Sequence, residues 1–229
     1  MCGRFTLTAD GNAVQLALGL ESTPDLQPRY NIAPSQPLAI ITNDQPIQVS
    51  HHSWGLIPHW SKDPAMAHKM INARSETAHE KPSFRDPFKY RRCLIPADGY
   101  YEWKVTDKKN KTPMYIFLNE HKLFAFAGLW EVWHAPDGSE IRTATILTTD
   151  SNEKTKGIHH RMPVILQPED YTIWLHSDDE QAKRKLMQPF PSDAMDVYPV
   201  STVVNKPAND TPENIVPVED GGMQQLGLF

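Results

Sequence analysis

Cysteine, basic charge and long apolar runs are all scarce in this sequence of 229 residues. Two cysteines, Cys2 and Cys93, are too few for a disulfide framework or a four-cysteine zinc site, and we expect both to be free thiols. No apolar run approaches the roughly 18 residues of a membrane-spanning helix. Arg4 also interrupts the N-terminus where a signal peptide needs an apolar core. We therefore expect a cytoplasmic protein without membrane contact.

The net charge of −5 counts against a simple nucleic-acid-binding protein, which is usually basic overall. Basic residues nevertheless gather in residues 85–92, which predict either a local basic groove or a solvated helix face. The ten histidines do not indicate a metal hydrolase, because there is no His-Glu-x-x-His and the pairs His51-His52 and His159-His160 are adjacent. No metal and no cofactor is therefore predicted.

Short runs rich in β-branched and aromatic residues predict strands at 38–42, 47–54, 93–96, 100–105, 114–118, 123–129, 141–148 and 162–166. Helices are predicted at 10–20, 75–79, 84–90, 168–175 and 179–187. This pattern favours an α+β fold: one domain of curved, mostly antiparallel, barrel-like β-sheets with short peripheral helices. We expect residues 1–206 to form this domain, as a monomer, and the polar, proline-containing residues 207–229 to form a flexible tail.

The second residue carries the most distinctive chemistry. Removal of Met1 would leave Cys2 with an α-amine and a thiol on adjacent carbons. Their reference pKa values, about 7.7–8.0 and about 8.5, give both groups reactive fractions near neutral pH. With an aldehyde, the amine forms a Schiff base and the thiol closes on the imine carbon to give a thiazolidine. Closure is intramolecular, which favours it strongly. Position alone, however, favours an incidental or merely buried cysteine, because many proteins have a small second residue.

Six short motifs accompany this cysteine, at residues 2–5, 29–34, 54–60, 71–77, 97–103 and 158–163. In this order they resemble the SRAP family (SOS response-associated peptidases), over residues 1–204. The resemblance implies a DNA-repair enzyme that crosslinks its N-terminal cysteine to abasic sites in single-stranded DNA. It also implies self-removal of the initiator methionine, and leaves an abasic-site lyase activity open. When engaged on DNA, such a protein would be associated with the nucleoid.

Carried over residue by residue, the resemblance places the catalytic groups on Cys2, Asn72, Glu102 and His159. It places the phosphate-contacting arginines on Arg4, Arg74 and Arg161. Trp60 is a candidate for stacking on a base. The family often has a second tryptophan where this chain has Ser61, which puts part of that stacking in doubt.

The residue types suit these roles. A histidine can open the closed hemiacetal sugar, and either His159 or His160 could act. Glu102, if buried among aromatic rings, would have the raised pKa that proton exchange with the Cys2 amine requires. Asn72 could hold the amine or the sugar. Read locally, Asn72 is equally suited to capping a helix, Glu102 is better explained as a surface residue of a strand, and Trp60 could belong to the core.

Two further hypotheses remain. An N-terminal nucleophile amidohydrolase also begins Met-Cys-Gly, although the other motifs of its glutamine site are absent here. The chain also ends in Gln225, Leu226, Gly227, Leu228 and Phe229, which resembles the peptide that binds the bacterial sliding clamp. A chance match or a packed chain end explains this tail equally well.

Overall fold

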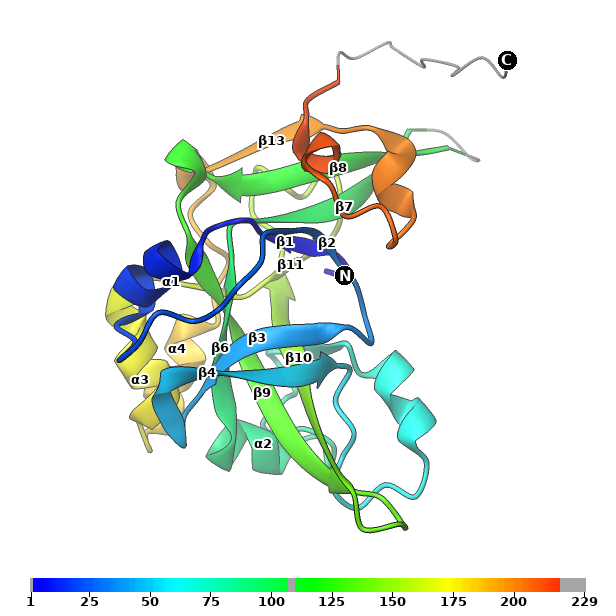
Figure 1. Cartoon of the computed structure of the whole chain (residues 1–229). Helices are drawn as coiled ribbons and strands as arrows, with labels where there is room; N and C mark the ends of the chain where they lie inside the picture. Colours follow the sequence, from blue (N-terminus) through cyan, green and yellow to red (C-terminus); the bar gives the residue numbers. More distant parts are fainter. Residues whose placement is uncertain (1, 107–109, 219–229) are drawn as a thin grey trace.

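Two β-sheets with short helices around them make up the described part of the chain, residues 2–106 and 110–218 of the computed structural model. One sheet closes on itself into a ring, and the other lies beside it and includes the first strand (Figure 1). The α+β, barrel-like class predicted from the sequence is confirmed. The mixed α/β content, the closed ring and the few short helices are those of that class.

The ring is built from five strands: β3 (Pro37–Thr42), β4 (Gln45–Trp54), β6 (Arg92–Ala97), β9 (Phe124–His134) and β10 (Glu140–Asp150). It closes because β9 pairs with β10 while β10 also pairs with β4. The β4–β10 pairing is parallel and the remaining ring pairings are antiparallel. Three short strands extend the ring: β5 (Asn72–Arg74), β11 (Arg161–Pro163) and β12 (Ile165–Leu166).

The second sheet has the order β13-β8-β7-β1-β2. Its strands are β1 (Phe5–Leu7), β2 (Arg29–Ile32), β7 (Gly99–Val105), β8 (Lys111–Leu118) and β13 (Met195–Pro199). The chain passes from the ring into this sheet at Asp98, whose carboxylate accepts hydrogen bonds from the backbone N–H groups of Thr8 and Ala9. Gly99 follows because a Cβ there would lie 2.2 Å from the hydroxyl of Tyr115. This crossing fixes β7 against β1, and hence the start of the chain.

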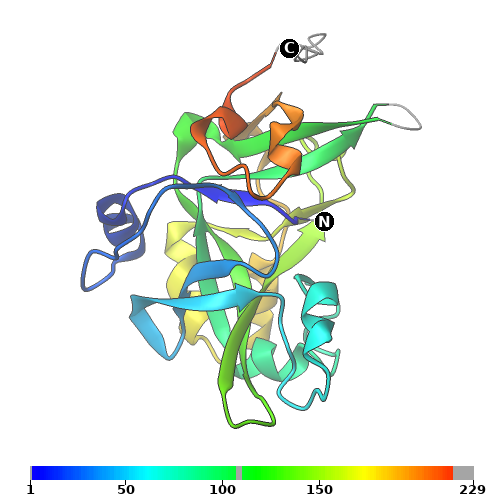
Figure 2. The same cartoon turned by 45° about the vertical axis from the view of Figure 1, so that its right-hand side comes forward.

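The α-helices are short and peripheral: α1 (Gly11–Leu18), α2 (Arg85–Tyr90), α3 (Tyr171–His176) and α4 (Glu180–Leu186). α3 and α4 pack beside the ring, and the start of the chain lies near the end of β10 in both views (Figures 1 and 2). The 3-10 helices are Pro64–Lys69, Asn119–His121, Pro168–Asp170, Ser192–Ala194, Thr202–Asn205 and Pro212–Ile215. Within the described ranges, no helix has the length and apolar character needed to cross a membrane.

The helix predicted at residues 75–79 is wrong, because these residues form turns. The Ser75 N–H instead continues the pairing of β5 by donating to the Thr148 carbonyl. The basic segment at 85–92 is neither a groove nor one solvated face. Arg92 is buried and donates to the carbonyls of Trp174 and Leu175, and Arg91 pairs with Glu131.

The sequence predicted a flexible tail from Pro207 onwards. The structure instead shows residues 207–218 packed against the rest of the protein. Residues 200–218, which we call the C-terminal clasp, lie over β1, β2 and β7 (Figure 1). Within the clasp, Asn214 is fully buried and Val200 pairs with Pro217. The buried asparagines Asn31 and Asn214 and the ion pair between Arg29 and Asp210 hold the segment. The polar composition of the segment alone did not indicate these contacts. The predicted clamp-binding residues Gln225, Leu226, Leu228 and Phe229 lie outside the described residues.

Candidate active site

Cys2 lies in the interior, three residues before the start of β1. Its side chain is fully buried in the main apolar cluster together with Phe5 and Tyr100. Burial, and then the charge of the nearby Glu102, raise the pKa of the Cys2 thiol far above its usual range. The resting thiol is therefore protonated at neutral pH, and it needs a base before it can act as a nucleophile. Cys93 is also buried, as expected for a structural thiol.

Asn72 contacts Cys2 directly. Its side-chain Nδ2 donates to the Cys2 carbonyl at 2.7 Å. It comes from β5, which is held in place by parallel pairing with β10. The side-chain Oδ1 of Asn72 is buried and has no hydrogen-bond partner among the described residues. Asn72 therefore fixes the backbone of the reactive residue and also presents an acceptor beside it, and it does not cap a helix.

Glu102 lies on β7, next to the strand that begins after Cys2. Its side chain is buried, with 5% of the residue exposed, and this burial raises its pKa. Because side chains alternate along a strand, Glu102 and Tyr100 share the face of β7 that packs on the main cluster. A raised pKa brings a carboxyl group closer to the pH at which it exchanges protons with an amine or a thiol. The alternative that Glu102 is a surface residue is excluded.

His159 is half-buried and His160 is exposed, and the two rings stack with centroids 4.4 Å apart. His159 Nδ1 accepts from the Arg161 backbone N–H at 3.0 Å and lies 3.2 Å from the Arg161 carbonyl. The backbone of Arg161 can thus bind His159 in both of its charge states. Its N–H donates to the neutral ring, and its C=O accepts from the protonated ring. Burial lowers the pKa of His159. These features suit His159 to proton transfer better than its neighbour.

The three predicted phosphate-contacting arginines differ in their environments. Arg74, at the end of β5, is exposed. Arg161 is buried, and its guanidinium pairs with Glu76 at 2.7 Å and with Asp150 at 2.8 Å. Arg4 is buried against the clasp, where it donates to Asn31 Oδ1 and to the Val204 carbonyl. Among the three, the structure leaves only Arg74 presented to solvent, and phosphate binding by all three stays a prediction.

Trp60 is half exposed, in contrast to the fully buried core residue Trp54. Its neighbours anchor the loop that carries it. His59 pairs with Glu131 at 3.1 Å, and the Ser61 carbonyl accepts from Trp133 Nε1 at 2.7 Å. Ser61 itself is buried, so it does not take the place of a second stacking ring. Trp60 is thus an exposed ring on a fixed loop.

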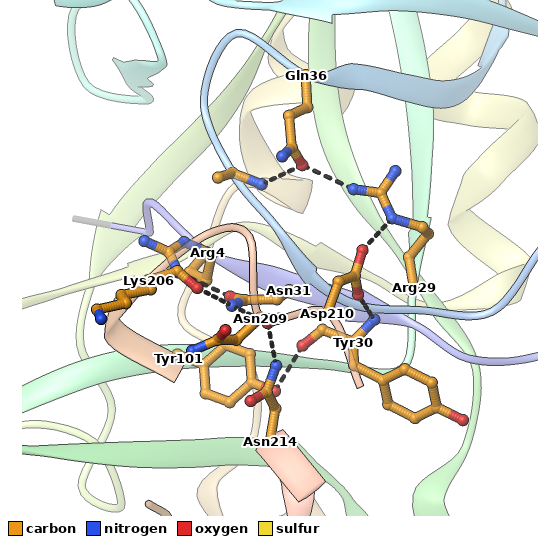
Figure 3. Close-up of polar contacts among 11 residues, drawn as sticks. Arg4, Arg29, Tyr30, Asn31, Gln36, Tyr101, Lys206, Asn209, Asp210 and Asn214 are labelled. Carbon is orange, nitrogen blue, oxygen red and sulfur yellow. Dashed lines mark hydrogen bonds and ion pairs between the residues drawn. The ribbon is translucent and has the colours of Figure 1, made fainter. Parts of the chain in front are cut away.

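A polar network behind β1 and β2 joins the clasp to the site (Figure 3). The Asn31 Nδ2 donates to the carbonyls of Val204, Lys206 and Asn209, and its Oδ1 accepts from Arg4. Asp210 pairs with Arg29 and accepts from the Tyr30 N–H. Because Arg4 is two residues from Cys2, this network holds the strand that carries the candidate nucleophile.

The sequence did not assign roles to Tyr100, Asn31 or Asp210. The alternation of β7 carried a signal for Tyr100, which lies two residues before Glu102 and therefore on the same face. The motif at 29–34 marked Asn31 without revealing its partners, which come from more than 170 residues away along the chain. Among residues 2–106 and 110–218, no three His, Cys, Asp or Glu side chains gather as metal ligands.

Comparisons with known proteins agree with this geometry. The family model described as SOS response associated peptidase (SRAP) matches residues 1–207. The Abasic site processing protein YoqW of Bacillus subtilis is 46% identical over 221 residues, covering 94% of this chain and 99% of that protein. The Abasic site processing protein HMCES of Gallus gallus is 33% identical, covering 85% of this chain and 68% of that protein.

A crystal structure of a protein from Bacteroides thetaiotaomicron superposes with a TM-score of 0.86 at 31% identity, covering 95% of this chain and all of that one. The family match spans most of the sequence, and it includes Cys2, Asn72, Glu102 and His159. The chain therefore belongs to the SRAP family.

Proposed function

We propose that this protein processes abasic sites in single-stranded DNA by forming a covalent thiazolidine through Cys2, after removal of Met1. One observation carries the proposal. The second residue is a buried cysteine whose carbonyl is held by Asn72 and whose thiol pKa is raised by burial and by the charge of the buried Glu102. The names of the relatives YoqW and HMCES, both abasic site processing proteins, support the same substrate.

The first step joins the Cys2 amine to the sugar aldehyde. Glu102 takes a proton from the attacking amine and returns it to the departing hydroxyl, so that one water leaves and an imine remains. The raised pKa of Glu102 suits both transfers, since the group must change its charge near neutral pH. The open acceptor of Asn72 orients the amine or a sugar hydroxyl. His159 opens the closed sugar ring by moving a proton between its oxygens.

The second step closes the ring. The Cys2 sulfur attacks the imine carbon, the π electrons of the C=N bond move to nitrogen, and the thiol proton is carried by Glu102 to that nitrogen. The net reaction joins amine, thiol and aldehyde with the loss of one water. The exposed Arg74 holds a phosphate beside the site, and Trp60 stacks on a base. We place Arg4 and Arg161 one layer behind these contacts.

A crosslinking assay tests the function directly. The mature protein is incubated with an oligonucleotide that contains one abasic site, and the products are separated under denaturing conditions. We expect an adduct with the wild type and none with Cys2→Ala. An intact oligonucleotide serves as the matched control. Equal retention of abasic and intact strands, with no product that survives denaturation, would instead identify a non-covalent binding protein.

Self-processing and strand cleavage are separate parts of the proposal. We expect Met1 to be absent from the purified wild type and retained when Glu102→Gln is introduced, because amide cleavage also needs a proton-transfer group. For the lyase activity, we expect His159→Ala to slow ring opening and strand cleavage more than DNA binding. Unchanged cleavage by this variant would remove His159 from that step.

The C-terminal peptide extends the proposal to a partner. The residues Gln225, Leu226, Leu228 and Phe229 fit the apolar groove of a bacterial sliding clamp, which would bring the protein to replication forks. Deletion of residues 226–229 should abolish co-purification with the clamp and leave crosslinking unchanged. Undiminished co-purification would dismiss the clamp as the partner of this peptide.

A further inference from the structure

Tyr100 is a polar side chain on the inner face of β7. It is fully buried, and it belongs to the same apolar cluster as Cys2, with its ring centroid 6.1 Å from that of Phe126. It pairs across the sheet with Phe5, three residues after Cys2, and shares its face with Glu102. The neighbouring Tyr101 points the opposite way, into a separate cluster with Tyr115.

The Tyr100 hydroxyl has no hydrogen-bond partner among the described residues, although a buried hydroxyl normally has one. Burial raises its pKa well above the usual range, and the charges of Cys2 and Glu102 raise it further. The face of β7 that Tyr100 shares with Glu102, and the pairing of Tyr100 with Phe5 three residues after Cys2, put these groups in the same part of the apolar cluster. The phenol therefore keeps its proton where Cys2 reacts, and it has a hydrogen bond to give.

We propose that the Tyr100 hydroxyl donates a hydrogen bond to the Cys2 sulfur as the thiol loses its proton, making Tyr100 a catalytic residue of ring closure. This inference rests on the proposed thiazolidine chemistry. A thiolate buried among apolar side chains is unfavourable unless a donor faces it. While Glu102 is still charged it disfavours loss of the thiol proton, and a neutral donor facing the sulfur stabilises the thiolate as that proton moves to Glu102.

The electrons and protons of the step are accounted for. The Cys2 S–H bond breaks and its proton passes to the Glu102 carboxylate. The sulfur pair forms the bond to the imine carbon, the C=N π pair moves to nitrogen, and Glu102 passes the thiol proton on to that nitrogen, which ends as the neutral N–H of the ring. Tyr100 keeps its own proton throughout, and its hydrogen bond to sulfur weakens as the charge on sulfur is spent in the new bond. The phenol thus acts on the charge that develops before the C–S bond forms.

Tyr100→Phe separates this role from a structural one. Two products are followed over time: the imine, trapped by borohydride as an adduct whose thiol still reacts with iodoacetamide, and the closed ring, whose thiol does not. We expect imine formation within about twofold of wild type, because only the amine takes part, and ring closure slowed by at least about tenfold. The melting temperature should stay the same or rise, because an unpartnered buried hydroxyl has been removed.

Tyr101→Phe is the matched control. Its hydroxyl donates to the Tyr30 carbonyl at 2.8 Å, on the other face of the same strand. We expect this variant to melt at a lower temperature and to close the ring at the wild-type rate. The assignment of Tyr100 is overturned if Tyr100→Phe closes the ring as fast as wild type, or if imine formation and closure fall together with the melting temperature. Absence of any adduct with the wild type would instead remove the proposed function itself.

Discussion

Burial controls the acid–base chemistry of individual side chains here. Cys2 and Glu102 are both buried, and for both the pKa is raised, so each holds its proton more tightly than in water. Either group would be hard to ionise alone. Because both lie in the same cluster, the Glu102 carboxylate can accept the proton of the Cys2 thiol. Reactivity in this site therefore depends on exchange within the cluster more than on bulk solvent.

Glu102→Gln tests that exchange. Burial raises the pKa of Glu102, so its carboxylate is lost at a higher pH than the usual value of about 4.3. Below that pKa the group cannot take a proton from the amine, and the rate of adduct formation should fall as pH falls. We expect Glu102→Gln to react at least about 100-fold more slowly and to lose this acidic limb. The pH–rate profiles of both proteins check it. A variant as fast as wild type across the range would exclude Glu102 from the chemistry.

His52 gives a prediction about stability. It is 1% exposed, and burial lowers its pKa to about 4, against about 6.5 in an unfolded chain. The unfolded chain therefore takes up a proton that the folded chain does not, so this contribution is complete above pH 6.5 and is lost as pH falls towards 4. The loss should approach about 3 kcal/mol.

Urea unfolding of wild type and His52→Phe between pH 7 and pH 4 measures this loss of unfolding free energy. Phenylalanine keeps a ring against Trp130, which His52 meets at a centroid distance of 5.8 Å. We expect the variant to lose less stability than wild type over this range. Parallel curves for the two proteins would show that His52 does not titrate in this way.

At the scale of elements, two short strands position the residues of the candidate site. β1 and β5 have three residues each, and they bring Cys2 and Asn72 together from positions 70 residues apart. Neither strand was predicted, because three residues carry too little alternation to be recognised. The long ring strands β4, β9 and β10 were predicted, since each contains a run of β-branched and aromatic residues. The site therefore rests on elements that gain their structure from tertiary pairing.

Arg74 and Arg161 separate binding from folding at this scale. Arg74 is exposed at the end of β5, so Arg74→Ala should weaken binding to any single strand and reduce the salt dependence by about one phosphate contact. Arg161 joins β11 to Glu76, Asp150 and the Thr148 carbonyl, so Arg161→Ala should destabilise the fold by about 2–3 kcal/mol.

Fluorescence anisotropy across salt concentrations, with urea unfolding of the same variants, distinguishes the two roles. Each arginine serves as the control for the other. An unchanged salt dependence in Arg74→Ala would contradict its phosphate contact. If Arg161→Ala unfolds at the same urea concentration as wild type but binds single-stranded DNA more weakly, Arg161 contacts DNA instead of stabilising the fold.

Over the whole molecule, a segment near the C-terminus supports the N-terminus. The clasp reaches back to Asn31, Arg29 and Arg4, and these contacts join positions about 180 residues apart. The class of fold could be predicted from the sequence, because class follows from the count and spacing of β-rich runs. The closure of the ring and the clasp could not, because each depends on which distant partners a polar side chain meets. The predicted division at residue 206 falls within the clasp.

A chain that ends after residue 206 therefore lacks residues 207–218, the larger part of the clasp. We expect it to melt well below the full-length protein and to form little adduct, because the strand after Cys2 loses its support. A chain that ends after residue 218 keeps every described clasp contact and is the control. Asp210→Ala should have a smaller effect, about 1.5–3 kcal/mol. Equal melting temperatures for the two shortened chains would mean that residues 207–218 contribute nothing to the stability of the fold.

The central claim is that the amine and the thiol of Cys2 both become part of one thiazolidine ring. Peptide mass spectrometry of the purified adduct tests this most directly. We expect the modified peptide to begin at Cys2, to carry the sugar minus a single water, and to resist alkylation at sulfur. A modified peptide that still begins with Met1, or one whose Cys2 thiol reacts with iodoacetamide, would contradict the account.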